Sequence, residues 1–416
     1  MLVVQKFGGT SMGSLDRIRN VASKVVKEYL ENNSLVVVVS AMSGETNRLV
    51  GLVKDSCKIF GKNGITDDVL SEYDSIISTG ENVSAGLLAS MLCLMGYKSR
   101  SFNAWQLGFL TNDSFSSASI ESIETNILND FIKEGGIPIV TGFQGFSKKA
   151  NRVTTIGRGG SDTTAVAIAA ALKADRCDIY TDVDGVYTCD PRVVKNAKRL
   201  NEVGFEEVVE MASSGAKVLH TRCIIIAMNY GVVTRVLSSF SEDNSGGTIL
   251  KKDSDIMEKK VVTAVSIDSN EVQIALFGVV DRPGVSSAVF KPLADLNINV
   301  DMIVQCPSYG QTGKTDLAFT INNADLHRAI ECIERHKDTI GYDKLDVKDG
   351  VSKVSVIGAG MKTHPGVAAK AFDVMSAEGI NIIAISTSEI KISMLIDLKY
   401  TELAARALHD GFELGN

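Results

Sequence analysis

Residues 155–172 read TIGRGGSDTTAVAIAAAL, and this stretch decides the class of fold. Its alanine-rich second half predicts a helix over 162–173. From Arg158 onward, its first half places an arginine, two glycines, a serine and an aspartate at the mouth of that helix. Such a turn offers donors for an anion together with one carboxylate. An ordinary glycine-rich turn with a serine or aspartate N-cap remains the competing interpretation.

Around this stretch, about the first 240 residues alternate short apolar runs with longer amphipathic stretches, which is typical of an α/β sheet. Strands are expected at 2–5, 35–39, 137–141 and 178–181, and helices at 14–31, 80–95 and 162–173. Because the strands are continuous apolar runs, they favour parallel pairing with both faces covered. The polar segment 238–252 breaks the pattern and is the candidate domain boundary.

Two further segments follow predicted strands and carry polar chemistry. Residues 5–11, QKFGGTS, place a lysine and two glycines where backbone N–H groups and a cation can converge on a phosphate. A glycine turn beside a surface lysine would look the same. Residues 180–191, YTDVDGVYTCDP, concentrate acidic and hydroxyl groups where loops commonly bind ligands, although solvated turns share this composition. The GKT triplet at 313–315 lacks the first glycine of a Walker A loop and is expected in a loop.

The tail contains an internal repeat with an offset of 82 residues. Pro283, Gly284 and Val285 recur as a Pro-Gly-Val at 365–367, and the Ile-Asn pair at 298–299 recurs at 380–381. Each unit predicts a strand, a turn opened by Pro-Gly, a helix and a strand that begins at Ile-Asn. Further strands are expected at 316–321 and 392–398. Two small α+β modules are the simplest account, and a duplication with a purely structural role is the alternative.

Composition excludes several classes of function. The chain of 416 residues has 44% hydrophobic residues, six prolines and a net charge of -7, which gives no general attraction to nucleic acid or anionic lipid. The seven cysteines are scattered and never spaced as CxxC, so they argue against disulfides and a zinc site. Lys6 interrupts the start that a signal peptide would need, and no run of about 18 apolar residues exists. A cytoplasmic protein that binds neither nucleic acid nor membrane is expected.

Six motifs, taken in their order along the chain, indicate a protein family. They are KFGGTS (6–11), STGE (78–81), GRGGSD (157–162), YTDVDGVYTCDPR (180–192), SGAKVLH (214–220) and STSEIKIS (386–393). Over essentially the whole chain this set resembles the aspartate kinases, and the two tail repeats resemble ACT regulatory domains. The resemblance implies an α/β three-layer sandwich with a mainly parallel sheet, the amino-acid-kinase fold, at 1–245. Two α+β ferredoxin-like ACT domains are implied at 262–340 and 350–416.

The resemblance also implies residue roles. Phosphoryl transfer would fall to Lys6, Gly8, Gly9 and Asp162, with Asp162 orienting Lys6. L-Aspartate would be held by Thr46, Glu81, Arg158 and Ser161, with Glu81 at the amino group and Arg158 with Ser161 at the carboxylate end. The nucleotide would be bound by Lys6, Phe7, Gly8, Gly9, Thr181, Asp182, Tyr187, Arg192, Lys217 and Val218. ATP and Mg²⁺ are the implied cofactors, and no residue is assigned as a metal ligand. Thr221 stands where related sequences often have proline.

The implied reaction yields 4-phospho-L-aspartate, the entry to lysine, threonine, methionine and diaminopimelate synthesis. Lysine, threonine or both are the expected inhibitors, with 281–284 and 299–305 near the first-repeat pocket and a homo-oligomer formed through the ACT domains. Two rivals stay open: a related kinase acting on glutamate or a nucleoside monophosphate, and a catalytically silent amino-acid sensor. A fused homoserine dehydrogenase is not expected because no GxGxxG follows the repeats.

Overall fold

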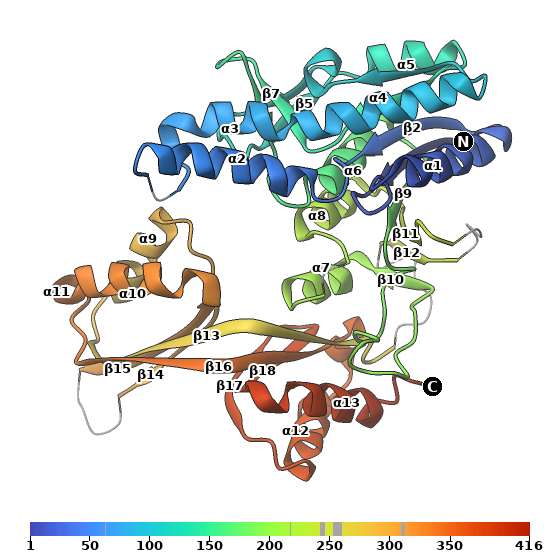
Figure 1. Ribbon diagram of the computed structural model, residues 1–416. Coiled ribbons are helices and arrows are strands. Elements are labelled where there is room, and N and C mark those ends of the chain that lie inside the picture. Colours follow the sequence, from blue (N-terminus) through green and yellow to red (C-terminus); the bar gives the residue numbers. More distant parts are fainter. Residues whose placement is uncertain (63, 217, 242–245, 253–259, 309–312) are drawn as a thin grey trace. The chain divides into compact units, whose positions relative to one another are not determined.

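The computed structural model describes residues 1–62, 64–216, 218–241, 246–252, 260–308 and 313–416 (Figure 1). The described residues form two compact units. The first contains 1–186 and 199–212 together with those within 217–257. The second contains the described residues of the tail from 260 onward and two short segments, 187–198 and 213–216, that lie within the range predicted for the first domain, 1–245.

The first unit is built on a mainly parallel sheet. Its strands are β1 (Leu2–Phe7), β2 (Ser34–Val39), β3 (Ser99–Phe102), β6 (Ile137–Thr141), β9 (Arg176–Thr181), β10 (Glu202–Gly204), β11 (Thr234–Ser238) and β12 (Thr248–Lys251). Among the described residues they lie in the order β10-β12-β11-β9-β1-β2-β6-β3, and the β11–β12 pair alone is antiparallel. The predicted parallel sheet is therefore confirmed.

Helices and a smaller sheet complete this unit. The helices are α1 (Leu15–Leu30), α2 (Glu45–Ile59), α3 (Leu70–Ile77), α4 (Thr79–Leu94), α5 (Asn126–Lys133), α6 (Gly160–Leu172), α7 (Phe205–Ser213) and α8 (Thr221–Tyr230). The smaller sheet has the strands β4 (Phe109–Thr111), β5 (Ile120–Ile123), β7 (Gln144–Ser147) and β8 (Arg152–Thr155), in the order β5-β4-β7-β8. The three predicted helices correspond to α1, α4 and α6.

The core explains why these elements pack as they do. Helix α1 begins at an N-cap, Ser14, whose hydroxyl accepts from the Arg17 backbone N–H. Its buried residues recur every three or four positions and pack, with those of α4, against the odd-numbered residues of β1 and β2. The even-numbered residues of these strands, such as Val4 and Val36, are equally buried, and α6 packs against β1, β2 and β9. The central strands are therefore apolar on both faces.

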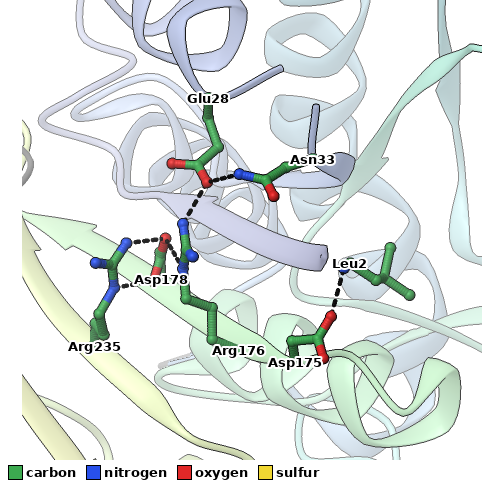
Figure 2. A network of polar contacts seen from close by, with 7 residues as sticks. All are labelled: Leu2, Glu28, Asn33, Asp175, Arg176, Asp178 and Arg235. Carbon is green, nitrogen blue, oxygen red and sulfur yellow. Dashed lines mark hydrogen bonds and ion pairs between the residues drawn. The ribbon is translucent and has the colours of Figure 1, made fainter. Parts of the chain in front are cut away.

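A buried ion network ties α1 to two central strands of this sheet (Figure 2). Asp178 on β9 is fully buried and accepts two hydrogen bonds from Arg235 on β11, both 2.6 Å, and one of 3.1 Å from Arg176. Arg176 also pairs with Glu28 on α1, which accepts from the Asn33 side chain at 2.6 Å. Because buried charges are tolerated only when paired, the network links α1, β9 and β11 in one arrangement.

The main sheet extends beyond the predicted domain boundary. Segment 238–252 was expected to separate domains, with the first ending at 245, yet β12 at 248–251 returns to the sheet and pairs with β10 and β11. Thr248 and Leu250 point inward and are fully buried, although the segment that leads to them is rich in polar residues. Gly247 has a φ of +102°, and a side chain there would collide with the Val236 carbonyl, so the reversal requires glycine.

The second unit contains the predicted repeat. Its strands are β13 (Ala264–Val280), β14 (Val300–Pro307), β15 (Lys314–Asn322), β16 (Lys344–Ile357), β17 (Ile382–Thr387) and β18 (Lys391–Asp397), and its helices are α9 (Val285–Asp295), α10 (Leu326–Arg335), α11 (Lys337–Ile340), α12 (Val367–Ala377) and α13 (Thr401–Gly411). The GKT triplet opens β15 instead of lying in a loop, and Lys314 pairs with Asp343.

The two Ile-Asn pairs end helices and do not begin strands. After α9, the Ile298 N–H donates to the Leu293 carbonyl at 3.0 Å, and after α12 the Ile380 N–H donates to the Met375 carbonyl at 2.9 Å. Both isoleucines are buried, as is usual for the apolar residue after this type of helix cap. Strands β14 and β17 therefore start just after the asparagines.

The two modules exchange strands. The six strands lie in the order β14-β15-β13-β16-β18-β17. The second part of β13 pairs with β15 in the first module, whereas its first residues, 264–268, pair with 353–357 of β16 in the second module. Conversely, residues 344–348 of β16 pair with 273–277 of β13. Each α+β module thus takes its fourth strand from the sequence range of the other module. The predicted contiguous ranges, 262–340 and 350–416, did not include this exchange.

Segment 187–198 packs into the second module. Cys189 and Val194 are buried in its core, and the Thr188 carbonyl accepts from the Val265 N–H at 2.8 Å. The Thr188 hydroxyl lies 2.9 Å from Nε2 of His409, a fully buried residue on α13. The last helix of the chain therefore holds a segment that lies more than two hundred positions earlier in the sequence.

One helical stretch, Leu70–Leu94, is long and apolar enough by length and composition to cross a membrane. Half of its most apolar window is buried inside the protein, and it carries the buried carboxylates Asp74 and Glu81. Those features are typical of core helices.

Candidate active site

A pocket of about 490 Å³ opens at the carboxyl ends of β1, β2 and β9, where open α/β sheets bind ligands. It also receives the starts of α2 and α6. The lining residues are Lys6, Gly8, Gly9, Thr10, Ser40, Ala41, Met42, Ser43, Gly44, Thr46, Asn47, Glu81, Phe143, Gly157, Arg158, Gly159, Gly160, Ser161, Asp162, Thr181 and Asp182. The sequence segments 6–9, 157–162 and 181–182, which are far apart in the chain, therefore meet in one place.

An ion pair lies in the wall of the pocket. Lys6 Nζ on β1 is 2.6 Å from Asp162 Oδ1 in the first turn of α6, and both side chains are at most 15% exposed. A lysine has several rotatable bonds, so a buried carboxylate partner restricts it to one position. The pair leaves the ammonium facing the pocket beside the N-terminus of a helix.

The two glycines after β1 allow close approach of backbone and ligand. A Cβ added at Gly8 would lie 3.3 Å from Lys6 Nζ, and one added at Gly9 would lie 3.1 Å from the Ala41 carbonyl oxygen. The Gly8 N–H donates weakly to the Tyr180 carbonyl at 3.3 Å. Side chains at either position would therefore crowd the lysine or the turn after β2.

Glu81 is a buried carboxylate with an unused oxygen. Its Oε1 accepts from the Ala41 N–H at 3.1 Å, whereas Oε2 has no hydrogen-bond partner within the described part of the chain. Burial raises the pKa of Glu81 to about 8, because the charged form loses solvation, and the bond from Ala41 offsets this only in part. A cationic group entering the pocket would favour the charged form.

The glycine-rich loop presents Arg158. Gly157 and Gly159 have φ values of +82° and +68°, and a Cβ at Gly159 would overlap His220. Arg158 between them is exposed and forms no ion pair with the residues that the structure describes. Ser161 follows in the first turn of α6 and packs against Gly142, where a Cβ would lie 2.6 Å from the serine Oγ. The arginine fork is thus free to meet an anionic ligand.

The loop is held by two charged residues that sequence reasoning missed. Asp74 on α3 accepts from the Thr155 N–H at 2.7 Å, and Arg222 on α8 donates to the Ile156 carbonyl at 2.8 Å. The helix of Asp74 also carries Glu72 and two serines, so this aspartate did not stand out in the sequence. Nothing in the sequence connected Arg222 to the loop.

Most of the predicted substrate and nucleotide residues line the pocket. Thr46, Glu81, Arg158 and Ser161 all line it, as do Lys6, Gly8, Gly9 and Asp162. Of the remaining nucleotide set, Thr181 and Asp182 line it and are joined by a 3.1 Å hydrogen bond.

The other predicted nucleotide residues are not among those that line the described pocket. Phe7 is fully buried and stacks on Tyr180 with 4.5 Å between the ring centroids, so it belongs to the hydrophobic core. Val218 is half-buried before α8. Tyr187 and Arg192 belong to the second unit, and Lys217 lies outside the described residues.

Comparisons with known proteins agree with this architecture. The amino acid kinase family model matches residues 1–238, and ACT domain models match 274–338 and 354–412. The chain is 45% identical to an aspartate kinase of Stutzerimonas stutzeri over 99% of this chain and 97% of that one. It is 43% identical to an aspartokinase of Helicobacter pylori over the full length of both.

Solved structures show the same similarity. E. coli aspartokinase III in complex with aspartate and ADP is 28% identical, with a TM-score of 0.81 and 99% of both chains covered. The same enzyme in complex with lysine and aspartate gives a TM-score of 0.77. The fold, with its parallel sheet, its pocket and its two interlocked modules, and the sequence identity over the full length support the same family. The chain therefore belongs to the aspartate kinases, which join an amino acid kinase domain to two ACT domains.

Proposed function

We propose that this aspartate kinase transfers the γ-phosphoryl group of ATP to the side-chain carboxylate of L-aspartate, yielding 4-phospho-L-aspartate and ADP. The observation that carries the proposal is the pocket in which a held lysine, a buried half-unpaired glutamate and a free arginine meet. A structural relative that was solved with aspartate and ADP supports the same pair of ligands. Glutamate and nucleoside monophosphates are disfavoured because the most similar full-length relatives are named for aspartate.

Two charged side chains and two hydroxyl side chains of the pocket complement aspartate. The buried Glu81 would take the α-ammonium group, which restores the charge that burial suppresses. Arg158 and Ser161 would hold the carboxylate end, since a planar guanidinium grips a carboxylate with two parallel bonds. Thr46, half-buried near the start of α2, would contribute a hydroxyl. The side-chain carboxylate is then left for the reaction.

Phosphoryl transfer needs positioning and positive charge more than proton transfer. The aspartate side chain has an ordinary pKa near 3.9 and is ionised at neutral pH, so no general base is required. One of its oxygens forms a bond to the γ-phosphorus while the bond from that phosphorus to the bridging oxygen of ADP breaks. Lys6 and the N–H groups of Gly8 and Gly9 would stabilise the transferred group, and Asp162 would keep Lys6 oriented.

The nucleotide would lie over the pocket rim. Thr181 and Asp182 line the pocket, and the family resemblance adds Phe7, Tyr187, Arg192, Lys217 and Val218 to this set. Mg²⁺ usually keeps several waters and uses one or two carboxylates with substrate phosphates. The donors at this site fit that requirement, because the exposed Asp182 and the carboxylate of Asp162 both line the pocket. The ion would offset phosphate charge when bound with ATP.

The tail would make the enzyme responsive to end products. We assign the reaction to the first step of lysine, threonine, methionine and diaminopimelate synthesis in the cytoplasm, with lysine, threonine or both as feedback inhibitors. The E. coli relative solved with lysine supports an amino-acid effector. Residues 281–284 and 299–305 are proposed to lie near the effector, within a homo-oligomer formed through the ACT domains.

A coupled ADP-release assay tests the proposal. Turnover is measured with aspartate and with glutamate, each with and without lysine plus threonine, and Lys6→Ala serves as the blank. Aspartate-dependent turnover that the effectors suppress is the expected result. Absence of turnover with aspartate in a folded, ATP-binding sample would refute the proposed reaction, and turnover that neither effector alters would refute the regulation.

A further inference from the structure

Two loops of the first unit lie against each other, and the second of them lines the pocket through Gly157 and Arg158. We call them the paired loops: residues 114–118 and residues 155–158, the second of which carries Arg158. The Ala118 N–H donates to the Thr155 carbonyl at 2.9 Å. A Cβ added at Gly157 would lie 3.3 Å from the Ser116 carbonyl oxygen, so the loops are in close contact. The position of Arg158 therefore depends on how the pair is held.

A buried carboxylate holds the paired loops from one side. Asp74 on α3 is fully buried and accepts from the Thr155 N–H at 2.7 Å and the Thr155 hydroxyl at 2.8 Å. It also accepts from the Ser116 N–H at 2.9 Å. Leaving a buried carboxylate without these hydrogen bonds would cost free energy, so the bonds restrict Asp74 and its partners to one geometry. Each loop is thereby tied to α3.

A guanidinium holds the same loops from another helix. Arg222 on α8 donates through Nη1 to the Ile156 carbonyl at 2.8 Å and through Nη2 to the Ala118 carbonyl at 2.9 Å. Because the fork is planar and rigid, it fixes the separation of the two carbonyls as well as their direction. Two opposite charges, on two helices, thus bridge the same two loops.

We propose that Asp74 and Arg222 are positioning residues for substrate recognition, which set the backbone from which Arg158 reaches the carboxylate end of aspartate. Neither lines the pocket, so both act through the loop. The inference rests on the proposed role of Arg158. A loop ordered before the substrate arrives spares the binding step the loss of conformational freedom, and this gain concerns aspartate and not ATP.

Adjacent threonines provide a matched pair of variants. Thr155 and Thr154 are both fully buried on β8. The Thr155 hydroxyl bonds to Asp74, whereas the Thr154 hydroxyl bonds to Thr111 at 2.6 Å and has no part in the paired loops. Thr155→Val and Thr154→Val each remove one buried hydroxyl bond with almost no change in volume. Thr155→Ser keeps the hydroxyl and serves as the conservative rescue.

The experiment compares the KM for aspartate with the KM for ATP in the full-length enzyme. Thr155→Val is expected to raise the KM for aspartate about three- to tenfold while the KM for ATP stays within about twofold, because a bond to a charged group is lost. Arg222→Met is expected to raise the KM for aspartate about tenfold or more, because two buried carbonyls lose their hydrogen-bond donor. Thr154→Val should leave both values within about twofold, and Thr155→Ser should restore the aspartate value.

Arg158→Ala distinguishes a failure of the positioning inference from a failure of the proposed role of Arg158. If it raises the KM for aspartate while Thr155→Val and Arg222→Met leave it unchanged, the positioning inference is overturned and the role of Arg158 stands. If both Michaelis constants rise together in Thr155→Val and in Thr154→Val, the effect is general loosening and the inference is again overturned. If Arg158→Ala itself leaves the KM for aspartate unchanged, the proposed role of Arg158 fails, and the inference fails with it.

Discussion

Aspartate binding should depend on pH through Glu81. Burial raises the pKa of this carboxyl to about 8, from an ordinary value of 4.5, so about nine-tenths of it is protonated in the free enzyme at pH 7. We propose that the substrate ammonium group binds next to Oε2, which favours the charged form. Binding at pH 7 should therefore release about 0.9 of a proton.

The magnitude follows from the difference between pKa and pH. Ionising Glu81 at pH 7 costs one pKa unit, about 1.4 kcal/mol, and this cost is deducted from the aspartate affinity. Each unit of pH below 8 adds about the same amount. The kcat/KM for aspartate should therefore rise about tenfold per pH unit up to about pH 8 and then level off, whereas the kcat/KM for ATP lacks this dependence.

Initial rates at low aspartate and saturating ATP, from about pH 6 to 8.5, measure the profile. Calorimetry in two buffers of different ionisation enthalpy measures the released proton. Glu81→Gln should have a level profile and a lower plateau, because the amide has no charge to gain. A wild-type profile that is already level below pH 8, or an equal slope in the variant, would refute the reasoning.

Stability provides an independent check with the opposite sign. Because the folded-state pKa is raised, the stability contributed by protonated Glu81 is fully present below pH 4.5 and is lost as pH rises through about 8. The free enzyme should therefore lose melting temperature across this window, and the loss should be smaller in Glu81→Gln. Aspartate should stabilise the wild type more at pH 8 than at pH 6, which is readable by thermal shift.

Three further outcomes are expected. Arg158→Lys should raise the KM for aspartate about tenfold, because an ammonium cannot make two parallel bonds to a carboxylate; steady-state kinetics measure this, and an unchanged KM contradicts the assigned role. Gly8→Ala should lower kcat about tenfold, since the new Cβ would lie 3.3 Å from Lys6 Nζ, whereas Gly86→Ala, with open space around it, should leave kcat unchanged. His409→Leu should lower the melting temperature by a few degrees, because the buried Thr188 hydroxyl loses its bond to the imidazole and keeps only the one that it accepts from the Lys198 N–H; an unaltered melting temperature would show that the bond is unimportant.

The sequence carried the local parts of this site. Glycines that follow an apolar strand or precede an alanine-rich helix mark positions where the backbone turns sharply, so the segments at 5–11 and 155–162 were recognisable before any contact was known. The family resemblance, and not spacing, supplied Glu81. Its pKa could not be inferred from the sequence, because it depends on burial under residues from other elements.

The long-range parts could not be predicted. Asp74 and Arg222 reach the glycine-rich loop from helices about 80 and 65 positions away, and no local pattern records such a bond. Strand β12 was hidden because its two apolar residues, Ile249 and Leu250, lie in a polar, glycine-containing segment that is typical of linkers. The periodicity of the repeat predicted two modules. It did not predict the exchanged strands, because a sequence period does not specify which strands pair.

The exchanged strands give a physical reason for a tail of two modules and not one. Strands β13 and β16 each run through both modules, so the sheet is continuous across the repeat. Near their crossing, Lys353 is buried between Glu271 on β13 and Asp301 on β14. Shifting one module alone would break part of the β13–β16 ladder. It would also separate the buried Lys353 ammonium from its carboxylate partners, and an unpaired buried charge costs free energy. An amino acid that binds one module must therefore change the energy of both, and this shared response is what a regulatory equilibrium requires.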